Sequence, residues 1–127
     1  MKKIATYQQI QIWYENVSEL MEIYQEDDNS LTMDVAWAII QNYKHLNQSI
    51  QVIKNAENQL IDKYGSLQSD GSKKIDQTCT EVVQAYNKEI DELMNQKTKI
   101  KIEKIDHRNL NVKMSLETAS LFDFMIN

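Results

Sequence analysis

The stretch NKEIDELMNQKTKIKIEKI, residues 87–105, contains a change of apolar rhythm that bears on the whole fold. In its first half, apolar residues recur at the spacing of a helix face, at Ile90 and Leu93. In its second half, apolar residues alternate with charged ones as in a strand, at Ile100 and Ile102. A helix should therefore end within this stretch and a strand should begin.

This strand needs a neighbour, and the residues that follow it offer one. Residues 106–109, DHRN, have turn chemistry, and LNVKM at 110–114 again alternates apolar with polar residues. We therefore expect a β-hairpin over about residues 98–114. Because an isolated two-stranded hairpin is marginal in water, its apolar face should lie on helices.

The remainder of the chain has helical periodicity. It contains no proline and two glycines, which favours long, unbroken helices. In the longest segment, apolar residues keep a heptad spacing that is typical of a coiled-coil or bundle seam. The expected helices cover about residues 6–25, 32–64, 76–96 and 115–126.

These elements predict a mainly α fold in a single domain, residues 1–127. We expect a three-helix antiparallel bundle with a long central helix, in which the first helix covers the groove between the second and the third. The small hairpin and a short carboxy-terminal helix complete it. That last helix, which ends in LFDFMI, is apolar nearly all round, so it should be buried in this chain or against another.

The single cysteine and the amino terminus bear on the cellular compartment. Cys79 excludes an internal disulfide, fits a reducing cytosol, and falls on the seam of the third predicted helix, where we expect a buried thiol. The opening MKKIATYQQIQIWY lacks the apolar run of a signal peptide, and no stretch is long and apolar enough to span a membrane. We expect a cytoplasmic protein without membrane contact.

Residues suited to catalysis or metal binding are few. His45 and His107 belong to no metal-ligand spacing, and we expect both to be partly exposed. The acidic residues Glu26, Asp27 and Asp28 lack the spacing of a calcium loop and should be solvated. We therefore expect no enzyme, with no catalytic residue, cofactor or metal.

An excess of apolar side chains away from the predicted seams favours an interaction surface. A contiguous apolar patch on a soluble protein marks a binding site. Glu57 is the one charged residue on the long seam, and it either lies in water beyond its partner helices or specifies a register or partner. The candidate protein-contact residues are Tyr14, Trp37, Glu57, Phe122, Phe124 and Met125.

Basic residues gather in the predicted hairpin. Residues 97–114 hold six basic and two acidic residues, a local balance of +4 in a chain whose net charge is −5. This strip has no aromatic residue for base stacking, and we favour the interpretation that its lysines protect a hairpin edge from adding further strands. The alternative is phosphate contact through Lys97, Lys99, Lys101, Lys104 and Arg108.

Several segments together resemble a known family. A long helix ending in IDKYG, a DG loop, YNKEIDELMNQKTKIKIEKI and the closing LETASLFDFMI are similar to a family of small proteins of unknown function encoded by phages and prophages of Gram-positive bacteria. The resemblance extends from about Val17 to Ile126. It implies a phage origin and a bacterial host cell, and it brings no active site that could be carried over.

Three hypotheses for function follow. The first is a non-enzymatic phage protein that binds another protein, as a stoichiometric inhibitor of a host antiviral defence effector such as a CRISPR-type nuclease. The second is an accessory or assembly protein of the virion or tail that self-associates, for example as a homodimer. The third and weaker hypothesis is a regulator that contacts nucleic acid through the lysine-rich hairpin.

Overall fold

The computed structural model of the chain describes residues 2–25, 31–110 and 113–126. This part of the chain is mainly helical and contains two short antiparallel sheets of two strands each. The helices are α1 (Tyr7–Tyr24), α2 (Met33–Tyr64), α3 (Thr80–Met94) and α4 (Leu116–Leu121), with two 3-10 turns, η1 (His107–Asn109) and η2 (Asp123–Met125). The strands are β1 (Lys2–Thr6), β2 (Ser66–Leu67), β3 (Lys73–Lys74) and β4 (Lys97–Lys101).

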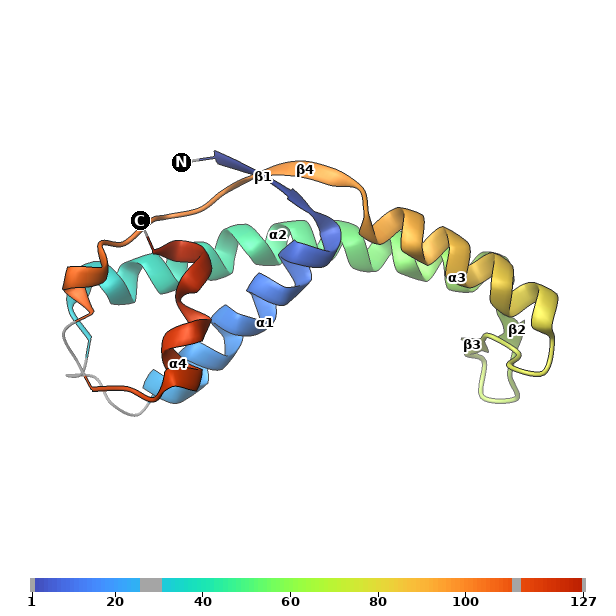
Figure 1. Cartoon of the computed structure of the whole chain (residues 1–127). Helices are drawn as coiled ribbons and strands as arrows, with labels where there is room; N and C mark the ends of the chain where they lie inside the picture. Colours follow the sequence, from blue (N-terminus) through green and yellow to red (C-terminus); the bar gives the residue numbers. More distant parts are fainter. Residues whose placement is uncertain (1, 26–30, 111–112, 127) are drawn as a thin grey trace.

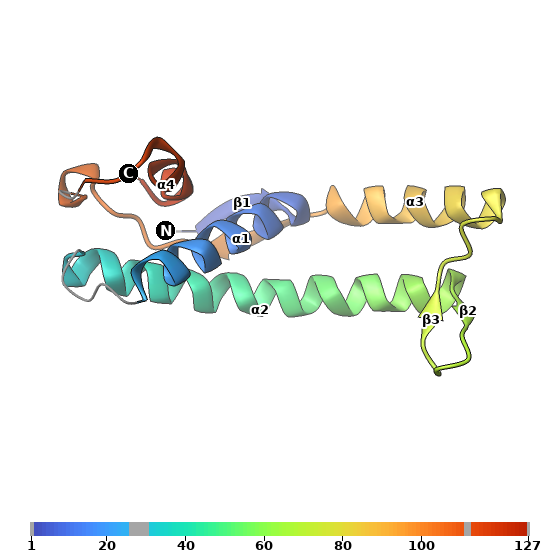
Figure 2. The same ribbon diagram turned by 90° about the horizontal axis from the view of Figure 1, so that it is seen from below.

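Helix α2 is the longest element; α1 and α3 lie along it, whereas α4 runs across its direction and packs on α1 (Figures 1 and 2). It begins after Thr32, whose hydroxyl accepts a hydrogen bond from the Val35 N–H, and Asp34 lies at the positive end of the helix dipole. Its 32 residues span about 48 Å. One face carries the core through Val35, Ala38, Ile39, Asn42, Leu46, Ile50 and Ile53.

The expected three-helix bundle is not confirmed. Both α1 and α3 run antiparallel to α2, but α1 lies along the amino-terminal part of α2 and α3 along its carboxy-terminal part (Figures 1 and 2). Tyr64 and Tyr86 meet edge to face at the α2–α3 contact, with ring centroids 6.4 Å apart. Within the described residues, α3 contributes Leu93 alone to the buried set. Most of the core therefore lies around the amino-terminal part of α2.

Strand β4 pairs with the amino-terminal strand β1 and not with the residues that follow it. The two strands are antiparallel, in a register that places Lys2 opposite Lys101 and Thr6 opposite Lys97. They lie side by side above α2 (Figure 1). The prediction of a β-hairpin over residues 98–114 is therefore wrong about the partner of this strand.

After β4 the chain leaves the sheet, and its next apolar side chains remain in the core. Ile102 and Ile105 are buried, and residues 107–109 form the 3-10 turn η1. Of the second predicted strand, residues 111–112 lie outside the described residues, and its other residues belong to no strand. Burial of two isoleucines on helices thus outweighs a local hairpin.

Asn42 ties this departing segment to α2. Among the described residues it is the one polar side chain in the core, with none of its surface exposed. Its Oδ1 accepts a hydrogen bond from the Glu103 N–H at 2.7 Å, and its Nδ2 donates to the Glu103 carbonyl at 3.0 Å. Both backbone groups of Glu103 are satisfied as they would be by a neighbouring strand.

The carboxy-terminal segment is buried within this chain. Phe122 and Met125 have no exposed surface, and Phe124 stacks on Trp13 of α1 with ring centroids 5.6 Å apart. The Ile105 N–H donates to the Met125 carbonyl at 2.8 Å, which fixes the segment beside the chain that leaves β4. The prediction that Phe122, Phe124 and Met125 form a protein-contact surface is wrong, because these side chains fill the core instead.

Cys79 is exposed at the start of α3, so the prediction of a thiol buried on a helical seam is wrong. The helix begins at Thr80, later than expected. Before it, the Asp76 carboxylate accepts hydrogen bonds from the Thr78 N–H at 3.0 Å and from the Thr78 hydroxyl at 2.6 Å. This turn delays the helix, because such side-chain bonds compete with helical backbone bonds.

We predict that Asn42→Ala lowers the free energy of unfolding by about 2–4 kcal/mol, because it removes the side chain that pairs with both the N–H and the carbonyl of the half-buried Glu103. Urea denaturation followed by circular dichroism measures this change. Asn55→Ala, at an exposed position of the same helix, is the matched control and should change stability by less than about 0.5 kcal/mol. Equal effects of the two substitutions would show that the Asn42 bonds carry no weight.

Candidate functional site

Four lysines lie together on the outward face of the β1–β4 sheet. Residues directly opposite each other in an antiparallel pair share one face. The cross-strand pairs on the outward face are Lys2–Lys101, Ile4–Lys99 and Thr6–Lys97. Ala5 and Ile100, which face the other way, are buried. We call Lys2, Lys97, Lys99 and Lys101 the lysine face.

The lysine face has little charge compensation. Lys101 lies 3.6 Å from the Glu103 carboxylate, and no other ion pair of these four lysines occurs within the described part of the chain. Lys2 and Lys101 are direct cross-strand partners, and like charges so placed destabilise a sheet. Together, β1 and β4 hold five lysines and no acidic residue. The face is therefore a local centre of positive charge on an acidic chain.

The predicted phosphate contacts divide into two groups. Lys97, Lys99 and Lys101 are brought together as expected from their alternation in the strand. Lys104 instead donates from Nζ to the Phe124 carbonyl at 2.9 Å, and the Arg108 guanidinium holds the Asp106 carboxylate with a closest contact of 2.6 Å. The latter two cations are thus occupied by contacts within the chain.

Sequence reasoning missed Lys2, the fourth member of the lysine face. The five residues of β1, KKIAT, are too few and too polar to signal a strand without knowledge of their partner. Lys3, the next residue, turns inward, where its Nζ donates to the Phe124 carbonyl at 3.4 Å and lies 5.7 Å from the centre of the Trp13 ring. The two neighbouring lysines therefore have different surroundings.

A second candidate surface lies at the amino-terminal end of α2. Met33, Trp37 and Ile40 are 80%, 50% and 44% exposed. Their spacing places them on one side of the helix, opposite the face that carries the core. Further along the same side, α2 is polar at Lys44, Asn47, Gln48 and Gln51. We call Met33, Trp37 and Ile40 the Trp37 surface.

Two hollows flank the Trp37 surface. One lies between Trp37 and the chain after β4, where Lys104, Ile105 and Asp106 form its wall. The other lies between α1 and α2, and is lined by Met21, Tyr24, Leu31, Ala36, Ile39 and Ile40, among others. The exposed tryptophan therefore stands between an apolar hollow and one with mixed charge.

The remaining predicted contact residues make contacts within the chain. Tyr14 stacks on Tyr43 with ring centroids 5.6 Å apart, and the pKa of Tyr43 is raised by its hydrogen bond to Tyr14. The Glu57 carboxylate accepts a hydrogen bond from the Gln11 side chain at 2.8 Å. Glu57 thus connects α2 to α1. Of the six predicted protein-contact residues, Trp37 is the one that is exposed.

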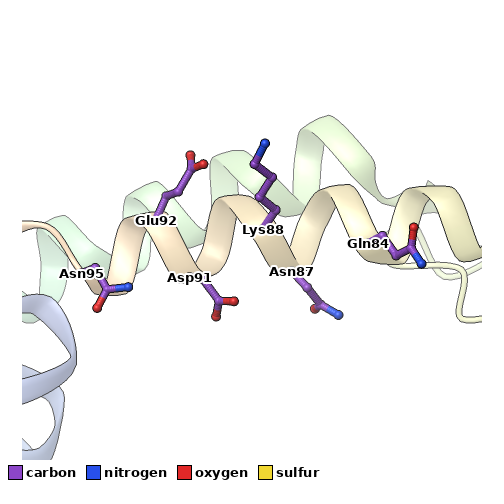
Figure 3. Close-up of a pocket in the computed structure, with 6 residues that line it drawn as sticks. All are labelled: Gln84, Asn87, Lys88, Asp91, Glu92 and Asn95. Carbon is purple, nitrogen blue, oxygen red and sulfur yellow. The ribbon is translucent and has the colours of Figure 1, made fainter.

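The described residues can be compared with the geometry of a metal site, and the hollow on α3 with that of a converging pocket. No group of three or more histidine, cysteine or acidic side chains in residues 2–25, 31–110 and 113–126 is placed to hold a metal ion. An open hollow is lined by residues of α3 and by Asn95, which follows the helix directly. Figure 3 shows Lys88 and Glu92 pointing to one side of the helix, with Asn87 and Asp91 pointing to the other. Side chains that diverge in this way do not converge on a substrate.

The two histidines do not add a site. His45 is half-buried, and its Nδ1 has no hydrogen-bond partner within the described residues. His107 is exposed in η1, with Nδ1 3.7 Å from the Asp106 carboxylate. The predicted acidic cluster of Glu26, Asp27 and Asp28 lies outside the described residues.

Comparison with known proteins identifies no relative: no family model, no curated protein and no solved structure matches the chain. Among the helices that the structure describes, none combines the length and apolar character that crossing a bilayer requires. Any functional inference therefore comes from the two surfaces themselves.

The pKa of Lys104, which lines the hollow beside Trp37, allows a test of the electrostatics there. Burial, followed by the hydrogen bond and the charge of Lys3, lowers its pKa to about 8, against the opposing charge of Asp123. A lysine whose pKa is lower in the folded than in the unfolded state favours folding most when it is neutral. Its contribution is therefore fullest above the ordinary pKa of 10.5 and is lost as the pH falls towards about 8.

We predict that Lys104→Met stabilises the protein most at or below about pH 8 and that this advantage shrinks as the pH rises towards 10. Urea denaturation at pH 7, 8, 9 and 10 measures the difference from the unsubstituted chain. Lys44→Met removes an exposed lysine of α2 and is the control, so the pH dependence of the difference should be larger for Lys104→Met than for Lys44→Met. A Lys104→Met advantage that does not vary with pH would contradict the assigned environment of Lys104.

Proposed function

We propose that this chain is a non-enzymatic, phage-encoded protein that acts inside the bacterial host by binding another protein through the Trp37 surface. The observation that supports this function is the exposure of Met33, Trp37 and Ile40 on one side of α2. Water contact with large apolar side chains is unfavourable by about 25 cal/mol per Å². A partner that covers them recovers this free energy.

The composition of the surface favours a protein partner. Tryptophan is enriched among the residues that dominate binding energy at protein interfaces, and methionine adapts to irregular partner surfaces. The hollows beside Trp37 could receive side chains of the partner, and the charged wall formed by Lys104 and Asp106 could supply a polar rim. This arrangement matches an apolar centre with polar edges.

The partner that we propose is a host antiviral defence effector, such as a CRISPR-type nuclease. We base this choice of partner on the resemblance to small phage proteins and on the small size and acidity of this chain, which has 127 residues and a net charge of −5. Inhibition by occupancy needs an exposed contact surface but no catalytic group. The two features of the chain, an apolar surface and diverging polar side chains elsewhere, agree with that mode of action.

We predict that Trp37→Glu abolishes inhibition, because it places a charge at the centre of the contact. The expected loss is about 2 kcal/mol or more, roughly a 30-fold rise in Kd. The measurement is phage plating on a Gram-positive host with an active CRISPR-type nuclease, followed by calorimetric titration of the purified effector.

Val52→Glu is the matched control, since Val52 is also exposed on α2, at 57%, but is far along the helix from the Trp37 surface. Phage that carry the Val52→Glu variant should plate as efficiently as phage that carry the unsubstituted chain. Equal loss in both variants, or protection that survives Trp37→Glu, would contradict the proposed surface. Stoichiometric presence of the chain in purified virions, with no effect on plating, would favour the assembly protein instead.

A further inference from the structure

We propose that the lysine face binds the phosphate backbone of a nucleic-acid duplex without reading its sequence. This inference is independent of the Trp37 surface, which lies on a different element. It rests on the joining of two chain segments, residues 2–6 and 97–101, that are separated by most of the sequence. Neither segment alone presents the full charge.

The spacing of the four lysines suits a duplex. Side chains on one face of a strand recur about every 6.6 Å, so Lys97, Lys99 and Lys101 extend over about 13 Å. Each strand of a duplex presents a phosphate every 3.4 Å of helix axis, or about four phosphates over that length. Lys2, opposite Lys101, widens the face by one strand spacing of about 4.8 Å.

The lysine face is available for such contacts. Lys2, Lys97, Lys99 and Lys101 are all exposed, and Lys101 alone has an ion-pair partner among the described residues. The other polar member of the face is Thr6, whose hydroxyl accepts a hydrogen bond from the Gln9 N–H at 3.1 Å. Ammonium groups that repel one another across the sheet gain free energy when an anion lies between them.

The residue types on the lysine face indicate which part of a nucleic acid it contacts. It has no aromatic side chain on which an unpaired base could stack, so it does not favour single strands. It has no arginine, asparagine or glutamine, the side chains that most often read base edges. Lysines without these companions position a protein on phosphates and carry no sequence information.

Salt dependence is the first test. Anisotropy of a fluorescein-labelled 20-base-pair duplex of mixed sequence measures the binding constant between 25 and 200 mM NaCl. Four phosphate contacts predict a slope of log K against log[NaCl] of about −3 to −4. Absence of binding at 25 mM NaCl would overturn the proposal.

Single substitutions test whether the lysine face is the surface that contacts the duplex. Lys99→Gln should make the slope shallower by about 1, since it removes one phosphate contact. Lys54→Gln makes the same change of charge on the exposed side of α2, away from the sheet, and should leave the slope within about 0.3 of the original value. Equal slopes for the two variants would overturn the assignment to the lysine face.

A triple substitution gives the larger effect. Lys97→Glu, Lys99→Glu and Lys101→Glu together should lower affinity at 50 mM NaCl by more than about 100-fold, whereas the matched set Lys44→Glu, Lys54→Glu and Lys88→Glu should lower it by less than about tenfold. Circular dichroism checks that both triple variants remain folded. If the first set does not fold, the single substitutions and their salt slopes still decide the matter.

Two further measurements distinguish duplex binding by the lysine face from binding of an acidic protein and from binding at the Trp37 surface. Polyglutamate that binds the lysine face more tightly than the duplex would identify an acidic protein as the occupant and overturn the proposal. Trp37→Glu should leave duplex binding unchanged, because Trp37 is not part of the sheet. Loss of plating protection with intact duplex binding would thus leave this inference standing.

Discussion

The pair of hydrogen bonds between the Asn42 side chain and the backbone of Glu103 fixes the segment after β4 on α2, and the positions of both terminal segments depend on it. Asn42 lies in the middle of the buried face of α2, and Glu103 is two residues beyond β4. By satisfying both backbone groups of Glu103, the amide lets an extended segment lie on a helix without a neighbouring strand. Ile102, which precedes Glu103, and Ile105, which follows it, can then both enter the core.

The consequences extend to both termini. With the segment after β4 seated on α2, β4 itself is placed to pair with β1, and Ile105 can receive the carboxy-terminal segment through the Met125 carbonyl. Phe124 then stacks on Trp13 of α1. Strand pairing, aromatic packing and the position of the lysine face are therefore coupled through one buried amide, since each element rests on the next.

The sequence alone predicted the bounds of α1 and α2 well, because helical periodicity is local. The last helix, expected over residues 115–126, ends at Leu121 instead and is followed by the 3-10 turn η2. The heptad pattern located α2 almost to the residue, from about 32–64 to the observed Met33–Tyr64. It could not identify the partner of β4, because the alternation in KTKIK is satisfied equally by the next segment and by a strand at the amino terminus. It could not place the start of α3, because the hydrogen bonds of Thr78 to the Asp76 carboxylate compete with the helix that the apolar pattern predicts there.

The candidate sites show the same limit. The alternating lysines of β4 were found in the sequence, but Lys2 becomes their neighbour only through pairing across most of the chain. The residues Phe122, Phe124 and Met125 looked like surplus apolar surface until the core that receives them was visible. One signal was available and overlooked: Asn42 continues the apolar spacing of Ile39 and Leu46, and a polar residue at a core position implies a buried partner.

The coupling of these elements through Asn42 can be examined at a single amide. Native-state hydrogen exchange by NMR reports the free energy needed to open the bond between the Glu103 N–H and the Asn42 side chain. The Glu103 amide should exchange as slowly as the amides of Leu46 and Ile50 in the core of α2, so that it opens only with global unfolding. Exchange as fast as at the exposed Gln77 would mean that the segment after β4 is not held by Asn42, and the arrangement of both termini would need another cause.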